Sequence, residues 1–88
     1  MKYRKKPVVV EAVCYTGANY KEIVDFTSGV AMPIFNNDED QFGEVMYVRT
    51  LEGNMCVNVG DLVIKGVQGE FYPCKPDIFS ETYERVTS

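Results

Sequence analysis

Residues 57–86 read VNVGDLVIKGVQGEFYPCKPDIFSETYERV, and this stretch decides the fold of the chain. Val57 and Val59 alternate with a polar residue, which is typical of a strand with one buried face. The pair Gly60-Asp61 predicts a tight turn, because glycine tolerates positive φ and an Asp side chain bonds nearby backbone groups. We therefore expect the chain to leave one strand and enter another here.

The next run, residues 62–65, is rich in β-branched side chains and predicts a strand. Leu62 and Ile64 share one face of it, and we expect that face to be buried. Residues 66–69 have a glycine at each end, Gly66 and Gly69, and predict a second reversal of the chain.

Residues 70–72 resume an extended pattern. Pro73 has no N–H to donate to a ladder, so this strand should lie at a sheet edge or end there. Pro76 suits the first position of a helix, which the sequence predicts to be short. We expect its inward side chains to pack on the aromatic residues of the preceding strand. These inward residues are Ile78, Phe79, Thr82 and Tyr83.

Two parts of the sequence carry a resemblance. The first is the opening, MKYRKKPVVVEA, residues 1–12. The second comprises Val59-Gly60-Asp61, Ile64-Lys65-Gly66-Val67, Gly69-Glu70-Phe71-Tyr72-Pro73-Cys74-Lys75-Pro76-Asp77-Ile78-Phe79 and Thr82-Tyr83-Glu84. Both resemble a family of small proteins from tailed phages and prophages that is labelled by a Pro-Gly-Asp-Tyr-Gly signature. The structural signature positions in this chain are Gly60, Asp61, Gly66, Gly69, Phe71, Tyr72, Pro76, Phe79 and Tyr83.

The chain departs from the signature at two positions, because Val59 replaces its proline and Leu62 replaces its tyrosine. The family has no established activity. The resemblance therefore implies a setting, the cytoplasm of a bacterial host, and it implies no catalytic residues.

The composition is that of an ordinary globular protein, 45% apolar and 25% charged, so we expect one domain over residues 1–88. No apolar run approaches the roughly 18 residues of a membrane span, and the opening does not fit a signal peptide. The basic head could contact nucleic acid, but the net charge of −4 would repel phosphate. We expect this head to be a solvated end. Its residues are Lys2, Arg4, Lys5 and Lys6.

The chain has no histidine and three widely spaced cysteines, Cys14, Cys56 and Cys74. A zinc site needs closely spaced ligands, so we expect no metal and no cofactor, and unpaired cysteines fit a reducing cytosol. We expect Cys14 to be a small buried residue, while Cys56 could face either way. Cys74 precedes a helix start that could lower its thiol pKa, which raises the hypothesis of a nucleophile. No histidine is present to act as its base.

The first strand is predicted at residues 8–15, where the even-numbered side chains share a face. Asn19 is predicted to cap a helix, with Glu22 completing a capping box. Gly29 is expected as the left-handed stop of that helix. Its predicted inward face holds Tyr20, Ile23, Val24 and Thr27.

Residues 31–35 are apolar and predict a short edge strand. In the polar run that follows, Asp38, Glu39 and Asp40 are adjacent. The ligand spacing of a calcium loop is missing, so we expect a solvated loop. Because loops often carry function, we also expect these three residues to contact a partner.

Residues 44–51 have apolar side chains on both faces and predict a central strand. Glu52-Gly53-Asn54 is the predicted hairpin turn, after which residues 55–59 return antiparallel.

These elements predict an α+β domain, with a mainly antiparallel sheet or partial barrel of about five strands. One helix follows the first strand, a short helix lies near the C-terminus, and we expect both helices to cover one face. The predicted core comprises Val8, Val10, Ile23, Val24, Val48, Val57, Leu62, Ile64, Phe71, Phe79 and Tyr83.

Three classes of function are open. The favoured class is a protein-binding module that acts on a host or phage protein, for example an inhibitor of a defence nuclease whose basic groove attracts Asp38–Asp40. A nucleic-acid-binding role would use Tyr72 near Lys75 for stacking, against the net charge. An enzyme would need acid–base groups to converge, and nothing in the sequence places two of them together. The available groups are Glu11, Asp61, Glu70, Tyr15 and Tyr72.

Overall fold

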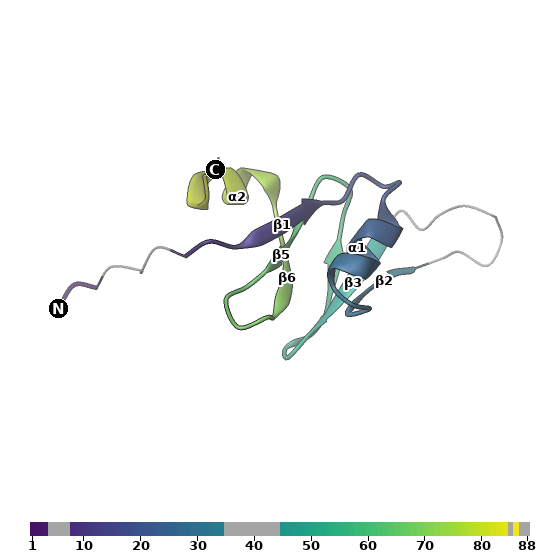
Figure 1. Ribbon diagram of the computed structural model, residues 1–88, viewed down its shortest axis with the longest axis horizontal. Coiled ribbons are helices and arrows are strands. Elements are labelled where there is room, and N and C mark those ends of the chain that lie inside the picture. The colour runs from purple at the N-terminus through teal and green to yellow at the C-terminus, as the bar shows by residue number, and fades with distance from the viewer. Residues whose placement is uncertain (4–7, 35–44, 85, 87–88) are drawn as a thin grey trace.

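The computed structural model describes residues 1–3, 8–34, 45–84 and 86 of the chain (Figure 1). In these residues six strands and two helices follow one another along the sequence. They are β1 (Glu11–Cys14), α1 (Tyr20–Phe26), β2 (Ala31–Ile34), β3 (Val45–Thr50), β4 (Gly53–Val57), β5 (Leu62–Lys65), β6 (Phe71–Cys74) and α2 (Pro76–Thr82).

The strands form two antiparallel three-stranded sheets: sheet A has the order β1-β5-β6, and sheet B has the order β2-β3-β4. The α+β class is confirmed, whereas the single sheet or partial barrel of about five strands is wrong. The chain changes sheet at Gly60, whose φ is 98°. There the Gly60 N–H donates to the Tyr15 carbonyl at 2.7 Å, so β5 pairs with β1 and does not continue beside β4.

Sheet A carries apolar side chains on both of its faces, and β5 is its central strand. The core face carries Val13, Val63 and Phe71, which face the main core. The opposite face, here called the α2 face, carries Ala12, Cys14, Leu62, Ile64, Tyr72 and Cys74. The predicted burial of the Leu62 and Ile64 face is confirmed at Ile64, while Leu62 is half-buried, and Val63 on the opposite face is fully buried as well.

The two helices lie on different sheets, so the expectation that both cover one face is also wrong (Figure 1). Helix α1 packs beside β2, and β6 of sheet A packs against β3 and β4. Phe79 and Tyr83 approach the α2 face, where they line a hollow together with Ala12 and Leu62. The ring centroids of Phe79 and Tyr83 lie 5.0 Å apart.

The main core lies between α1 and the two sheets. Its fully buried apolar residues are Tyr15, Ile23, Ala31, Met46, Val48, Val57 and Val63, and Ile64 is buried on the α2 face. Burial is confirmed for Ile23, Val48, Val57 and Ile64, and Val24 and Phe71 pack against the core. The prediction is wrong for Val8, which is 42% exposed, while Val10, Leu62, Phe79 and Tyr83 are only half-buried.

Helix α1 begins after Asn19 as predicted, but the capping box does not form in the usual way. Asn19 has φ −108° and ψ 35°, and its side chain makes no capping bond to the helix backbone. Its Nδ2 donates instead to Glu22 Oε1 and to the Cys14 carbonyl, both at 2.8 Å. The predicted stop is confirmed, because Gly29 has φ 88° and its N–H donates to the Val24 carbonyl at 2.9 Å.

Strand β3 is central in sheet B and β2 lies at its edge, as predicted. The hairpin turn is shifted from its predicted place at residues 52–54, because Thr50 pairs with Gly53. Leu51 and Glu52 are thus the two turn residues, and Gly53 begins β4 with φ 114°.

Helix α2 starts at Pro76, and β6 lies at an edge of sheet A, as Pro73 predicts. Of the four side chains predicted to face inward, Phe79 and Tyr83 are half-buried. Ile78 and Thr82 are exposed, so that part of the prediction is wrong. The helix has only seven residues and none of them is buried, while Phe79 and the following Tyr83 line a hollow with residues of sheet A.

Candidate functional site

An open apolar groove lies between the tip of the β3–β4 hairpin and the start of β6. Its volume is about 630 Å³, within the range of ordinary ligand and side-chain pockets. It is lined by Val30, Arg49, Thr50, Leu51, Glu52, Met55, Gly69, Glu70, Phe71 and Tyr72.

The apolar residues of this groove differ in how they are held. Phe71 packs edge-on against Phe26, with ring centroids 5.7 Å apart and planes at 70°, so this wall is fixed to the core. Leu51 at the hairpin tip is fully exposed, and Met55 on β4 is 42% exposed. A side chain that docks here would contact an ordered aromatic wall and remove two apolar side chains from water.

Three charged residues lie around the groove: Arg49, Glu52 and Glu70. Glu70 Oε1 accepts a hydrogen bond from the Gln68 N–H at 3.0 Å, and the Glu70 side chain is otherwise exposed. Within residues 8–34 and 45–84, Lys75 and Asp61 form the single ion pair, so Arg49 and Glu52 are both available to a partner.

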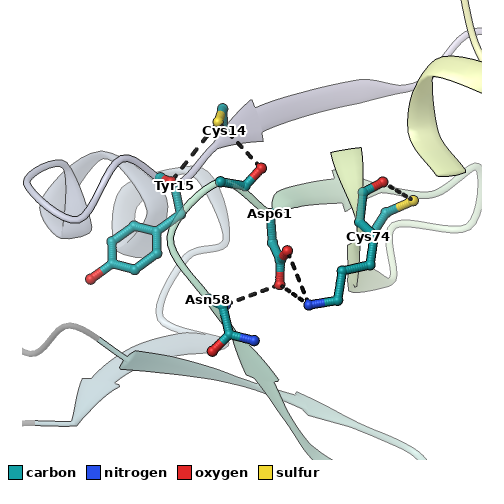
Figure 2. Close-up of polar contacts among 7 residues, drawn as sticks. Cys14, Tyr15, Asn58, Asp61 and Cys74 are labelled. Carbon is teal, nitrogen blue, oxygen red and sulfur yellow. Dashed lines mark hydrogen bonds and ion pairs between the residues drawn. The ribbon is translucent and has the colours of Figure 1, made fainter. Parts of the chain in front are cut away.

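A second polar cluster surrounds Asp61, which is only 4% exposed (Figure 2). Asp61 Oδ2 accepts a hydrogen bond from the Asn58 N–H at 3.0 Å, and the Asp61 N–H donates to the Asn58 carbonyl at 2.9 Å. Lys75 Nζ lies 3.3 Å from Asp61 Oδ1. The carboxylate is thus saturated by structural contacts, and the cluster closes the turn between β4 and β5.

The hydroxyl groups of Tyr72 and Tyr83 lie 3.4 Å apart and join β6 to the chain that follows α2. Burial raises the pKa of Tyr72 to about 12, and the hydrogen bond with Tyr83 and the charges of Tyr83, Glu70 and Cys74 add to the effect. A phenol with so high a pKa stays protonated at neutral pH and serves as a hydrogen-bonding group rather than a base.

The cysteines do not behave as the sequence suggested. Cys14 is exposed, so its predicted burial is wrong: it lies at the end of edge strand β1, with Sγ 3.7 Å from the Gly60 carbonyl. Cys56 is exposed too. Burial raises the pKa of the Cys74 thiol, and the carboxylates of Asp61 and Asp77 raise it further. The expectation that the helix start lowers this pKa is therefore wrong, and the thiolate is disfavoured.

The three candidate acids from the sequence do not converge on one site. Glu11 pairs with Lys65 at one end of β5, and Glu70 lies near that same end. Asp61 lies four residues before Lys65 at the other end of β5, about 13 Å away along an extended strand. Residues 8–34 and 45–84 contain no cluster of His, Cys, Asp or Glu able to hold a metal ion.

The predicted partner contact, Asp38, Glu39 and Asp40, lies outside the described residues. The groove itself was not predicted, because its walls come from distant parts of the sequence. One signal for it exists in the sequence. Leu51 is an apolar residue next to the predicted hairpin turn, a place where polar residues are usual.

No protein-family model, curated protein or solved structure matches this chain. The resemblance to the phage family therefore stays a prediction. None of the helices formed by the described residues is long and apolar enough to span a membrane.

Proposed function

We propose that this chain is a small protein-binding module that acts on a host or phage protein through the groove between the β3–β4 hairpin and β6. The observation that carries the proposal is the placement of Leu51. It is fully exposed at a hairpin tip, beside Met55 and the fixed ring of Phe71. Exposed apolar side chains that gather at a hollow are typical of protein-binding surfaces.

The charges favour a partner segment with an apolar anchor residue next to basic side chains. Glu52 and Glu70 outnumber Arg49 at the groove, and the net charge of the chain is −4. Charges of this sign steer a basic partner and raise its association rate. A nuclease with a basic nucleic-acid groove has this chemistry, so inhibition of such an enzyme is the specific form of the proposal. The run Asp38–Asp40 would add to the same attraction.

Affinity purification from host lysate with the wild-type chain and a Leu51→Asp variant tests the proposal, followed by titration of the recovered protein. Burial of a leucine contributes about 1.5–3 kcal/mol, so we expect Leu51→Asp to weaken binding by roughly ten- to a hundredfold. Ile78→Asp is the matched control, because Ile78 on α2 is 53% exposed and does not line the groove.

The Ile78→Asp variant should bind like the wild type, and both variants should keep the wild-type circular dichroism. Equal loss in the two variants would show that the groove is not the binding site. A partner that binds the Leu51→Asp variant with unchanged affinity would refute the proposal.

A further inference from the structure

Strand β1 has an unpaired outer edge. It is the first strand in the order β1-β5-β6, and no strand among the described residues pairs with its other side. The chain before it, Val8 to Val10, runs out from the body of the protein without a strand partner (Figure 1). Val8 and Val9 are 42% and 76% exposed. An exposed apolar edge of this kind is a template for pairing with another chain.

The hydrogen bonds at Tyr15 show which backbone groups of this edge point outward. The Tyr15 N–H donates to the Asp61 carbonyl at 2.8 Å, and the Tyr15 carbonyl accepts from Gly60, so Tyr15 turns both groups toward β5. In an antiparallel ladder the direction alternates along the strand. Glu11 and Val13 therefore face β5 as well. The N–H and C=O groups of the even-numbered residues point outward.

The side chain of Asn19 limits how far this open edge extends. Asn19 Nδ2 donates to the Cys14 carbonyl at 2.8 Å, which confirms that this carbonyl points away from β5. Because Asn19 already occupies the Cys14 carbonyl, this carbonyl is not open to a new strand. Within residues 8–14, the residues whose outward N–H and C=O groups are both left for a new strand are Val8, Val10 and Ala12.

We propose that the outer edge of β1 pairs antiparallel with β1 of a second copy of this chain, about a two-fold axis at Val10. In this register Val10 lies opposite Val10 of the second copy, and Val8 lies opposite Ala12. All three outward residues of each copy then form hydrogen-bonded pairs. Two three-stranded sheets become one continuous six-stranded sheet, through an isologous interface of the kind most dimers use.

Of the two neighbouring registers, the one centred on Glu11 fits less well. A two-fold axis at Glu11 would place the two Glu11 carboxylates directly opposite each other, which is unfavourable. It would also require the Cys14 carbonyl, which Asn19 already occupies. An axis at Val9 would set Ala12 opposite Lys6, which lies outside the described residues, and the Val9→Cys variant described below distinguishes this register from the Val10 register. The Val10 register pairs Val8, Val10 and Ala12 together and separates the two Glu11 carboxylates.

The apolar side chains of the outward residues support this register. Val8, Val10 and Ala12 share the α2 face, where an apolar hollow of about 450 Å³ opens beside the edge. Leu62 and Phe79 also line this hollow. The added strand would lay its own Val8 and Val10 next to this hollow and shield its apolar walls from water. The dimer thus covers an apolar surface that the single chain leaves open.

This inference does not depend on the proposed function. Strand β6, which lines the proposed groove, is the opposite edge of sheet A from β1. A dimer through β1 would leave two grooves open, one in each copy, and would permit bivalent binding.

Cysteine cross-linking in a background that carries Cys14→Ser, Cys56→Ser and Cys74→Ser tests the register. In a hydrogen-bonded antiparallel pair the two Cα atoms lie about 5.5 Å apart, which suits a disulfide. A Val10→Cys variant should therefore form a covalent dimer on mild oxidation. Val9→Cys is the matched control, because the two Val9 Cα atoms would lie roughly 8 Å apart, too far for a disulfide.

Light scattering of the unmodified chain provides the second measurement. We expect a mass of twice 10.0 kDa at micromolar concentration, and a monomer for Val10→Asp, which places two carboxylates at the axis. If Val10→Asp does not fold, the cross-linking result decides the question. A wild-type monomer up to millimolar concentration, or equal cross-linking of the Val9→Cys and Val10→Cys variants, would overturn the proposal. A dimer that fails to bind a partner would leave this inference intact and would count only against the proposed function.

Discussion

Lys75 Nζ lies 3.3 Å from Oδ1 of Asp61, and this contact joins the turn before β5 to the residue that precedes α2. The two partners differ in environment, because Asp61 is only 4% exposed whereas the Lys75 side chain is 55% exposed. The carboxylate also accepts the Asn58 N–H. The turn therefore depends more on Asp61 than on the lysine.

Removal of the Asp61 carboxylate should destabilise the fold more than removal of its cation. We expect Asp61→Ala to cost about 1–3 kcal/mol in the free energy of unfolding, because it leaves the Asn58 N–H without its acceptor. Asp61→Asn keeps an acceptor and should cost less. Lys75→Met should cost no more than about 1 kcal/mol, since the lysine is exposed to solvent. Urea denaturation checks this order, and a Lys75→Met variant less stable than Asp61→Ala would contradict it.

The Tyr72–Tyr83 pair should make stability depend on alkaline pH. The pKa of Tyr72 is raised from 10.0 to about 12 in the folded chain, so folding favours the protonated phenol. The resulting stabilisation is fully present below pH 10 and is lost as the pH rises through about 12. Tyr72→Phe should reduce the fall in the unfolding midpoint over this range, with little change at pH 7. Tyr3→Phe is the control, because Tyr3 is 85% exposed and lies outside the pair. An unchanged alkaline profile in Tyr72→Phe would refute the prediction.

Local features were predictable from the sequence where a backbone conformation or a missing N–H restricts which residue type can occupy the position. Gly29, Gly60 and Gly69 all have φ between 83° and 98°, and the turns and helix stop predicted at these glycines are present. The edge position of the strand with Pro73 follows in the same way from its missing N–H. These inferences need no knowledge of which elements pack together.

The division into two sheets was not predictable, because strand partners are non-local. Alternation shows which side chains share a face, but it does not show what covers that face. Leu62 pairs with Cys14, which lies far back in the sequence, and this pairing makes β5 central and buries Val63. The groove escaped prediction for the same reason, since Leu51 and Phe71 come together only through packing of β6 on sheet B.

Asn19 should be more important for stability than an ordinary helix cap. Its side chain accepts the Thr16 N–H at 2.8 Å and donates to the Cys14 carbonyl and to Glu22, so it ties β1 to α1. We expect Asn19→Ala to lower the free energy of unfolding by about 1–2 kcal/mol. Asn19→Asp keeps the acceptor for Thr16 but loses both donated bonds, and it should fall between Ala and the wild type. A thermal midpoint equal to that of the wild type in Asn19→Ala would contradict this role.

Two glycine substitutions should separate backbone strain from steric contact. A Cβ at Gly60 would meet no atom within 4 Å, but its φ of 98° is disfavoured for any other residue. We expect Gly60→Ala to cost about 1–2 kcal/mol from conformation alone. A Cβ at Gly66 would instead contact the carboxylate of Glu70, the far end of an exposed, flexible side chain.

Because this carboxylate can move away, Gly66→Ala should change stability by no more than about 0.5 kcal/mol. The double variant Gly66→Ala with Glu70→Ala removes the contact and should match the single Glu70→Ala variant. Chemical denaturation of the four variants measures both effects. If Gly66→Ala proves more destabilising than Gly60→Ala, steric contact at the β5–β6 turn outweighs backbone strain at Gly60, which would contradict the predicted order.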